Sequence, residues 1–280
     1  MKQEKYTVDG KTIDIMKEDW KYLIVLDACR FDYFEKNYKK YFTGVLKKGI
    51  SSTNNTMIWL NENFSGYYDD TIYLATVPYI NSVTETKLYD MTYDGKKHFF
   101  KIIDCEWSDE LKTIPPETVN KEAILTIKEY PDKRIIIHYL QPHDPFIGEN
   151  YRKYITKEYS ENEVIIKNDK RNKLGNAIKK IVGIQIMWKL GKIFNSETLS
   201  PVTLIGMNEG VTGIRKAYEE NLNLVLEYVS KLLPMLDGNV LIIGDHGEYL
   251  GEHGIYAHAT NKRTKEIWEV PYMIIKKEDQ

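Results

Sequence analysis

The stretch Asn239–His258 reads NVLIIGDHGEYLGEHGIYAH, and it joins a short apolar run to a dense group of polar side chains. The run Val240–Ile243 has the length and composition of a buried strand in a parallel sheet. It ends at Gly244, and Asp245 and His246 follow directly. A carboxylate and an imidazole at the end of a buried strand are suited to binding a divalent cation, and the flanking glycines let the backbone approach a ligand closely.

An exposed polar turn after a core strand is the alternative explanation for this Asp-His pair. The next 12 residues argue against it, because they add Glu248, Glu252, His253 and His258. Five of the six histidines fall in the windows 138–143 and 246–258, and both windows follow apolar runs. We therefore interpret the segment as part of a metal site.

Length and composition restrict the class of protein. The chain has 280 residues, of which 42% are hydrophobic and 29% charged, so we expect one domain spanning residues 1–280 with insertions at about 81–113 and 148–200. A net charge of -2 gives no basic surface for nucleic acid. Two cysteines are too few for a disulfide framework. Without a signal-like apolar core or a transmembrane run, the sequence predicts a soluble cytoplasmic protein.

A second apolar run, Tyr22–Leu26, also ends in a carboxylate, Asp27, and a short helix is predicted from Arg30 to Tyr38. In open α/β sheets, ligands bind beyond the carboxyl ends of parallel strands. We therefore expect Asp27 and Asp245 to lie at the same edge of one sheet. The alternative role for Asp27 is that of a helix N-cap.

A hydroxyl-rich run, residues 51–56, leads into a predicted helix that ends near Phe64. Thr56 would lie at or just before the first turn of this helix. Two interpretations remain open at this point. Ser, Thr and Asn cap helices routinely, but a hydroxyl at a helix N-terminus is also a candidate nucleophile, because the free N–H groups there favour an alkoxide and an incoming anion.

A third apolar strand, Lys133–Leu140, precedes His143, which lies between two prolines and is therefore held rigidly. His143 is the better candidate for chemistry. His138, inside the strand, is interpreted as a core histidine rather than a ligand.

The other predicted strands and helices alternate along the chain. The expected strands are Phe42–Leu46, Thr71–Thr76, His98–Ile103 and Val270–Ile275, and the expected helices run from Pro115 to Tyr130 and from Val211 to Leu236. This order predicts a doubly wound α/β sheet with one composite site. Within the second insertion, residues 176–194 have apolar residues at helical spacing with lysines between them. Such a helix contacts a membrane surface or a partner, or it packs on the domain.

Four segments in order, LIVLDACRFDYF, HYLQPHDPF, DHGEYLGEHG and EVPYMII, resemble the alkaline phosphatase superfamily, specifically its sulfatase-like branch. The resemblance covers about residues 22–275. It implies a three-layer α/β/α sandwich with a mostly parallel, doubly wound sheet. It also implies the hydrolysis or transfer of phosphate or sulfate esters at a metal site.

The resemblance assigns roles to individual residues. The implied metal ligands are Asp27, a hydroxyl within 51–56, Asp245 and His246. The residues implied to contact the substrate anion or to protonate the leaving group are His143 and His258, with Arg30 as a further candidate.

The nucleophile and the metal distinguish this chain within the resemblance. Sulfatases proper use a Cys or Ser in C/S-x-P-x-R, a motif that this sequence lacks, whereas phosphate-handling relatives use an unmodified Thr or Ser at the start of the next helix. Thr56 fits best, with Thr53 and Ser52 as alternatives. Ala28 stands where many sulfatases have a second Asp, and no D-x3-H motif lies near His143. We therefore expect one Mn²⁺ or Zn²⁺ ion rather than two.

The sequence thus predicts a metal-dependent phosphoric ester hydrolase or phosphotransferase with a covalent phosphothreonine intermediate. Its expected substrate is a phosphorylated small molecule or a glycan-linked or lipid-linked compound, and not a nucleic acid. Two alternatives are a sulfate-ester hydrolase and a binding protein of the same fold without catalysis.

Overall fold

A computed structural model describes residues 5–88, 90–155, 200–258 and 263–279. In these residues a central sheet contains nine strands, in the order β2 (Lys11–Thr12), β1 (Thr7–Val8), β4 (Val45–Ile50), β13 (Glu269–Ile275), β10 (Val240–Gly244), β3 (Tyr22–Asp27), β9 (Arg134–Pro142), β5 (Tyr68–Ala75) and β8 (Phe99–Asp104). The run from β10 to β8 is parallel, and β13 lies antiparallel between β10 and β4. The predicted mostly parallel α/β fold is confirmed.

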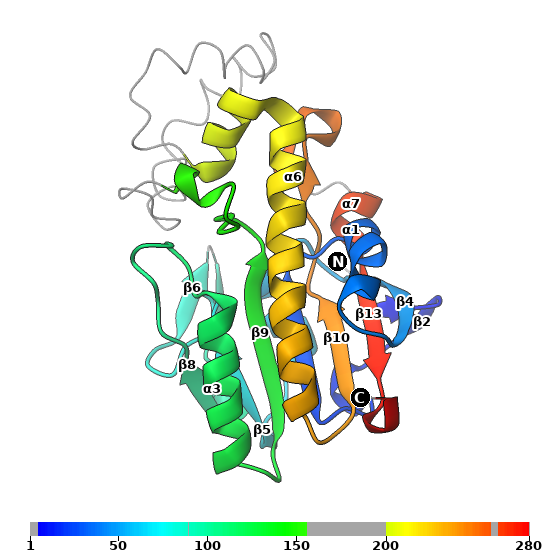
Figure 1. Cartoon of the computed structure of the whole chain (residues 1–280). Helices are drawn as coiled ribbons and strands as arrows, with labels where there is room; N and C mark the ends of the chain where they lie inside the picture. Colours follow the sequence, from blue (N-terminus) through cyan, green and yellow to red (C-terminus); the bar gives the residue numbers. More distant parts are fainter. Residues whose placement is uncertain (1–4, 89, 156–199, 259–262, 280) are drawn as a thin grey trace.

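Helices cover both faces of the sheet. The first face carries α1 (Phe31–Asn37), α3 (Pro116–Glu129) and α6 (Pro201–Leu232), and Figure 1 shows α3 and α6 side by side in front of β9. The other face carries α2 (Thr56–Asn63) and the N-terminal segment. Because strand side chains alternate, Ile24 packs toward α6 whereas Val25 packs toward α2. The result is a three-layer α/β/α sandwich.

Smaller elements complete the described part of the chain. Two hairpins pair β6 (Thr86–Leu88) with β7 (Met91–Tyr93) and β11 (Tyr249–Leu250) with β12 (Tyr256–Ala257), and α7 (Lys265–Trp268) precedes β13. The short 3-10 helices are η1 (Ile15–Lys17), η2 (Tyr38–Lys40), η3 (Gly95–Lys97), η4 (Arg152–Tyr154), η6 (Leu233–Met235), η7 (Glu252–Gly254) and η8 (Lys277–Asp279).

One predicted boundary was wrong, and one helical segment was not predicted. The strand expected at Phe42–Leu46 is β4, Val45–Ile50, whose register is set by antiparallel pairing with β13. The span of α6 joins two helices across Gly210: the first begins at Pro201, after the Ser200 cap, and was not predicted, whereas the second follows Gly210 as expected. Gly210 has φ 68° and ψ −167°, a conformation that glycine adopts readily, and it kinks the helix where the sequence pattern appeared to start.

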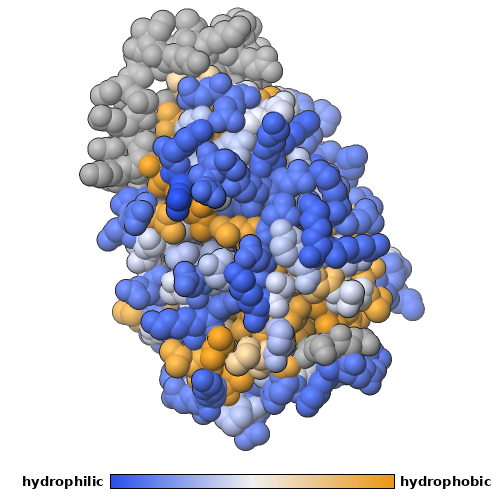
Figure 2. Space-filling model, in the orientation of Figure 1, coloured by the Kyte–Doolittle hydropathy of each residue, from blue (hydrophilic) through white to orange (hydrophobic). Residues whose placement is uncertain are grey.

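The surface of the face that carries α3 and α6 is mostly hydrophilic, with separate apolar patches (Figure 2). Among the described residues, no helix has both the length and the apolar character required to cross a bilayer.

Gly247 follows the Asp-His pair at a point of close backbone packing, which gives a test of the fold. A Cβ atom added there would lie 2.1 Å from the carbonyl oxygen of Glu266, and the N–H of Gly247 donates to the Ile267 carbonyl at 2.6 Å. We expect Gly247→Ala to lower the free energy of unfolding by about 3 kcal/mol, because backbone must move. Urea denaturation measures the change.

Gly66→Ala is the control, because the atoms nearest to a Cβ there belong to the Tyr68 side chain, at 3.3 Å or more. It should change stability by less than about 0.5 kcal/mol. Equal stability of the two variants would contradict the packing described for Gly247.

Candidate active site

Asp27 and Asp245 lie together at one edge of the sheet. Asp27 is the last residue of β3, and Asp245 follows β10 directly. The two strands are parallel neighbours, with Gly244 opposite Leu26. Asp27 is 4% exposed, and Asp245 is fully buried. The register of two strands is therefore sufficient to bring the carboxylates into one buried site, as the sequence predicted.

Backbone N–H groups fix the orientation of the Asp245 carboxylate. Its Oδ1 accepts hydrogen bonds from the N–H groups of Ala28 (3.0 Å) and His246 (2.7 Å). Ala28 has a φ of 54°, which is uncommon for a residue other than glycine. The Tyr218 hydroxyl donates to the Ala28 carbonyl oxygen at 2.7 Å. With Oδ1 engaged by the backbone, Oδ2 is directed toward Thr56.

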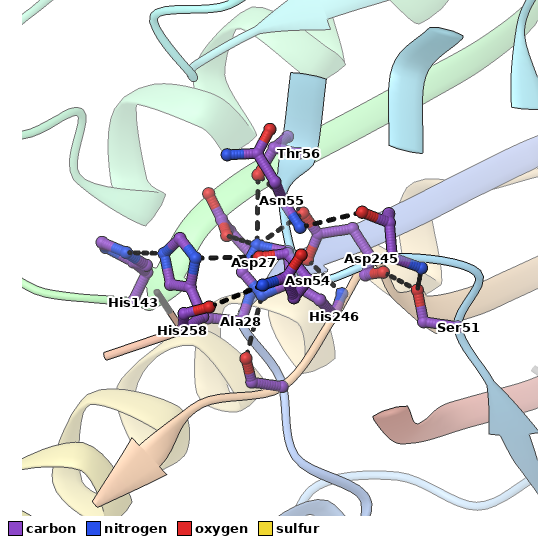
Figure 3. A network of polar contacts seen from close by, with 12 residues as sticks. Asp27, Ala28, Ser51, Asn54, Asn55, Thr56, His143, Asp245, His246 and His258 are labelled. Carbon is purple, nitrogen blue, oxygen red and sulfur yellow. Dashed lines mark hydrogen bonds and ion pairs between the residues drawn. The ribbon is translucent and has the colours of Figure 1, made fainter. Parts of the chain in front are cut away.

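Thr56 is the first residue of α2, and its hydroxyl faces the ends of β3 and β10 (Figure 3). The helix cap is Asn55, whose Oδ1 accepts from the N–H groups of Met57 (2.9 Å) and Ile58 (3.3 Å). Thr56 is thus not needed as a cap. Its Oγ1 donates to Asp245 Oδ2 at 2.8 Å and lies 3.3 Å from His246 Nε2.

The two alternative hydroxyls lie elsewhere. Thr53 Oγ1 accepts from the N–H of Asn55 at 3.2 Å, which closes the turn before α2. Ser52 lines a separate cavity beside Tyr6. The structure therefore favours Thr56 over Thr53 and Ser52.

His246 presents a nitrogen lone pair to the site. Its Nδ1 donates to the Gly247 carbonyl oxygen at 2.9 Å, so Nε2 carries no proton in the neutral ring. Nε2 lies 3.4 Å from Asp245 Oδ2 and 3.6 Å from Asp27 Oδ1. Burial lowers the pKa of His246 to about 3, so the ring is neutral near pH 7.

His143 and His258 form a pair beside this group. Their Nε2 atoms are 3.3 Å apart, and the His258 ring centroid is 4.4 Å from that of His246. The Nδ1 atoms donate to the carbonyl oxygens of Asp144 (2.7 Å) and Asn54 (2.9 Å), respectively. Burial and the neighbouring histidines hold the pKa of His258 well below its ordinary value. Two facing lone pairs repel, so the pair is arranged to share a proton or to contact a positive or proton-donating group.

α6 supports two of the loops that form the site. Tyr218 bonds to the Ala28 carbonyl oxygen after β3 and accepts from the N–H of Arg30 at 2.9 Å. One turn later, Asn221 Nδ2 donates to the carbonyl oxygens of Pro142 (3.2 Å) and His143 (3.0 Å) after β9. One helix thus fixes the loops that follow two neighbouring strands.

Arg30 does not occupy the place that the sequence suggested. Its guanidinium is buried and bonds to Asp32 and to Glu252, with Nη1 2.9 Å from Glu252 Oε1. Nη1 also donates to the Glu248 carbonyl oxygen at 3.2 Å. These contacts tie the segment after Asp245 to α1, so we assign Arg30 to the support of that segment and not to the chemistry.

His138 is the residue whose place the sequence did not reveal. It is buried, as expected of a core histidine, but one ring nitrogen lies within 4.8 Å of a carboxylate oxygen of Asp27 and one of Asp245. Burial lowers its pKa to about 4. The pairing of β9 with β3 is what would have revealed this position. His138 lies opposite Val25, and Val25 is on the same face of β3 as Asp27, two residues later.

The arrangement fits a divalent cation. Two buried carboxylates, an imidazole nitrogen and a hydroxyl come from three segments of the chain and face a common point, as Figure 3 shows for Asp27, Thr56, Asp245 and His246. Within the described residues, Asp245 pairs with no lysine or arginine. A positive ion would balance this buried charge, and the mixed oxygen and nitrogen donors suit Zn²⁺ or Mn²⁺.

The predicted amphipathic helix at 176–194 lies outside the described residues, as does residue range 156–199 of the second predicted insertion.

Comparisons with known proteins agree on the fold. A family model described as Sulfatase matches residues 33–280, a range that begins after Asp27. Lipooligosaccharide phosphoethanolamine transferase A (EptA) from Neisseria meningitidis, an integral membrane protein, is 12% identical with a TM-score of 0.50, and the match covers 99% of this chain and 51% of that one. The periplasmic domain of EptC from Escherichia coli is 12% identical with a TM-score of 0.51, covering 98% and 76%. No curated protein matches the sequence.

This chain spans about half the length of the EptA chain. The expectation of a cytoplasmic protein is contradicted by these similar structures, which are described as an integral membrane protein and as a periplasmic domain.

The ion pair at Arg30 gives a pH-dependent prediction. Burial alone would raise the pKa of Glu252, but the charge and hydrogen bond of Arg30 hold this pKa below its ordinary value of 4.5. A lowered carboxyl pKa adds stability above the unfolded-state pKa, and this stability is lost as the pH falls through the folded-state pKa. We expect Glu252→Gln to cost about 1 kcal/mol at pH 7 and progressively less below about pH 4.5.

Urea denaturation of wild type and variant over a pH series measures this difference. Glu227→Gln, which removes an exposed pair with Lys231, should cost almost nothing at any pH. A Glu252→Gln cost that stayed constant down to pH 3 would show that charge is not the cause.

Proposed function

The chain belongs to the sulfatase family of the alkaline phosphatase superfamily, and on that basis we propose that it is a metal-dependent phosphoryl-transfer enzyme whose nucleophile is Thr56. The observation that carries the proposal is the position of the Thr56 hydroxyl, at the start of α2 and 2.8 Å from Asp245 Oδ2. A threonine is a secondary alcohol and cannot be oxidised to the aldehyde of formylglycine. This favours phosphate over sulfate esters as substrates.

Asp27, Thr56, Asp245 and His246 would hold one divalent cation. Bound there, such an ion lowers the pKa of the Thr56 hydroxyl and withdraws charge from a phosphoryl oxygen. The start of α2 adds the positive end of the helix dipole at the place where the substrate anion must approach.

The residues of the chain account for each step of the transfer. Thr56 Oγ1 gives its proton to Asp245 Oδ2, which already accepts its hydrogen bond, and forms a bond to phosphorus, while the bond from phosphorus to the leaving oxygen breaks. A substrate anion bound beside the His143–His258 pair favours its protonated form, and the pair then gives this proton to the leaving oxygen. Water or the hydroxyl of an acceptor then attacks the phosphothreonine and gives its proton back to the His143–His258 pair. The bond from phosphorus to Thr56 Oγ1 breaks, and Thr56 regains its proton from Asp245.

We propose as substrate a phosphate ester of a small molecule, a glycan or a lipid. EptA is described as a lipooligosaccharide phosphoethanolamine transferase. A covalent phosphothreonine can pass its phosphoryl group to the hydroxyl of an acceptor as well as to water, so both transfer and hydrolysis are compatible with the proposal.

Replacement of Thr56 tests the nucleophile. We expect Thr56→Ala to lower turnover of an aryl phosphate monoester or diester by at least about 10³-fold, because no covalent intermediate can form. Bound metal should remain, since three ligands are unchanged. Intact-mass spectrometry should detect a phosphorylated adduct on wild type and none on the variant.

Thr53→Ala is the matched control and should keep turnover within a few-fold. An aryl sulfate, added chelator and supplied Mn²⁺ or Zn²⁺ complete the panel. Wild-type turnover by Thr56→Ala, or hydrolysis of the sulfate alone, would refute the proposal.

The leaving-group role of His143 and His258 makes a separate prediction. His258→Gln should reduce turnover of an alkyl phosphate ester by about 10²-fold, because an alkoxide leaves poorly without a proton. With a nitrophenyl ester, whose leaving group needs no proton, the loss should be only a few-fold. Equal losses on both substrates would instead indicate a role in binding the anion.

A further inference from the structure

His138 has no part in the proposed chemistry, although it lies against the metal-site carboxylates. It is at the middle of β9, on the face that packs against α2, and its ring centroid is 6.3 Å from that of Trp59 and 6.0 Å from that of Tyr73. All three side chains are fully buried. His138 therefore lies on the core side of Asp27 and Asp245, beneath the carboxylates.

The hydrogen bond to Tyr73 decides which nitrogen of His138 carries the proton. The Tyr73 hydroxyl and His138 Nδ1 are 2.6 Å apart, and this is the single hydrogen bond of that hydroxyl in the described part of the chain. If Nδ1 donated, the phenol proton would be left buried without an acceptor, and a bare Nε2 lone pair would face two carboxylates. If the phenol donates, its proton is satisfied and Nε2 bears a hydrogen.

Nε2 has no hydrogen-bond partner among the described residues. The acceptors within reach are the carboxylates, because a ring nitrogen of His138 and one oxygen each from Asp27 and Asp245 lie within 4.8 Å of one another. A buried N–H costs free energy until it is satisfied, so a modest movement of the carboxylates toward it is favourable.

We propose that Tyr73 and His138 form a hydrogen-bond relay that positions the metal ligands Asp27 and Asp245. The relay is directional: Tyr73 O–H donates to Nδ1, and Nε2–H is directed at the two carboxylates. It orients the carboxylate oxygens toward the ion from the core side, where no water competes. His138 is thus a positioning residue and not a fifth ligand. The inference rests on the metal site of the proposed function.

The test compares metal affinity in three full-length variants, by competition of Zn²⁺ or Mn²⁺ with a chromophoric chelator. We expect Tyr73→Phe and His138→Leu to weaken binding by about 10-fold or more, the effect typical of groups that support metal ligands. His138→Gln keeps an N–H donor near the position of Nε2 and should retain affinity within a few-fold. In Co²⁺-loaded protein, the visible absorption of His138→Gln should match that of wild type, because no ligand is lost.

Tyr93→Phe is the matched control, because it also removes a buried tyrosine hydroxyl, which donates to the Phe64 carbonyl oxygen at 3.2 Å. It should leave metal affinity unchanged. Thermal unfolding in chelator identifies any variant that fails to fold, and Tyr73→Phe, which removes one oxygen atom, remains informative if His138→Leu does not fold.

The outcomes separate the relay from the proposed function. Wild-type affinity in Tyr73→Phe and His138→Leu overturns the relay while the metal-dependent function stands. A changed Co²⁺ spectrum in His138→Gln also overturns it, in favour of direct coordination. A wild-type protein that binds no metal would remove the basis of both, and an inactive Thr56→Ala variant that still binds metal supports the function independently.

Discussion

The site depends on the different hydrogen bonds made by the two oxygens of one buried carboxylate. Oδ1 of Asp245 is held by two backbone N–H groups, one of them from Ala28 at the end of the neighbouring strand. Oδ2 is thereby directed at Thr56. Because the first contact joins β10 to β3, the carboxylate can keep its orientation only while the two strands keep their register. The fold supplies the alignment, and a few side chains at the sheet edge turn it into a chemical site.

Most of this arrangement could be predicted from the sequence because it follows from strand ends. Buried parallel strands are continuous apolar runs, and the first polar residues after them fall at one edge, which gives Asp27, Asp245 and His246 without any coordinates. Thr56 required a further step, since capping residues and nucleophiles occupy the same kind of position. Only the observation that Asn55 makes the capping bonds separates the two roles.

Side chains inside elements and in ion pairs were harder to predict, for a physical reason. His138 is an ordinary core residue by local pattern, and its neighbours are set by a strand pairing that involves residues over a hundred positions away. Arg30 lies three residues after the end of β3, but its guanidinium is directed by the carboxylates of Asp32 and Glu252 and by the Glu248 carbonyl oxygen. The helical segment that begins at Pro201 was not predicted, because the break at Gly210 separates it from the apolar period of the long helix that follows.

The three hydrogen bonds that Tyr218 and Asn221 of α6 donate to the site loops have a mechanical consequence. They attach the loop after β3 and the loop after β9 to the same helix, at two residues that are less than one turn apart. The loop that follows Asp27 and the loop that carries His143 are therefore held to neighbouring positions on one helix. We expect a tilt of this helix to displace both loops together, so that the distance between Asp27 and His143 changes little. Binding of a partner at the other end of α6 would therefore move the proposed site as a unit, without changing the geometry within it.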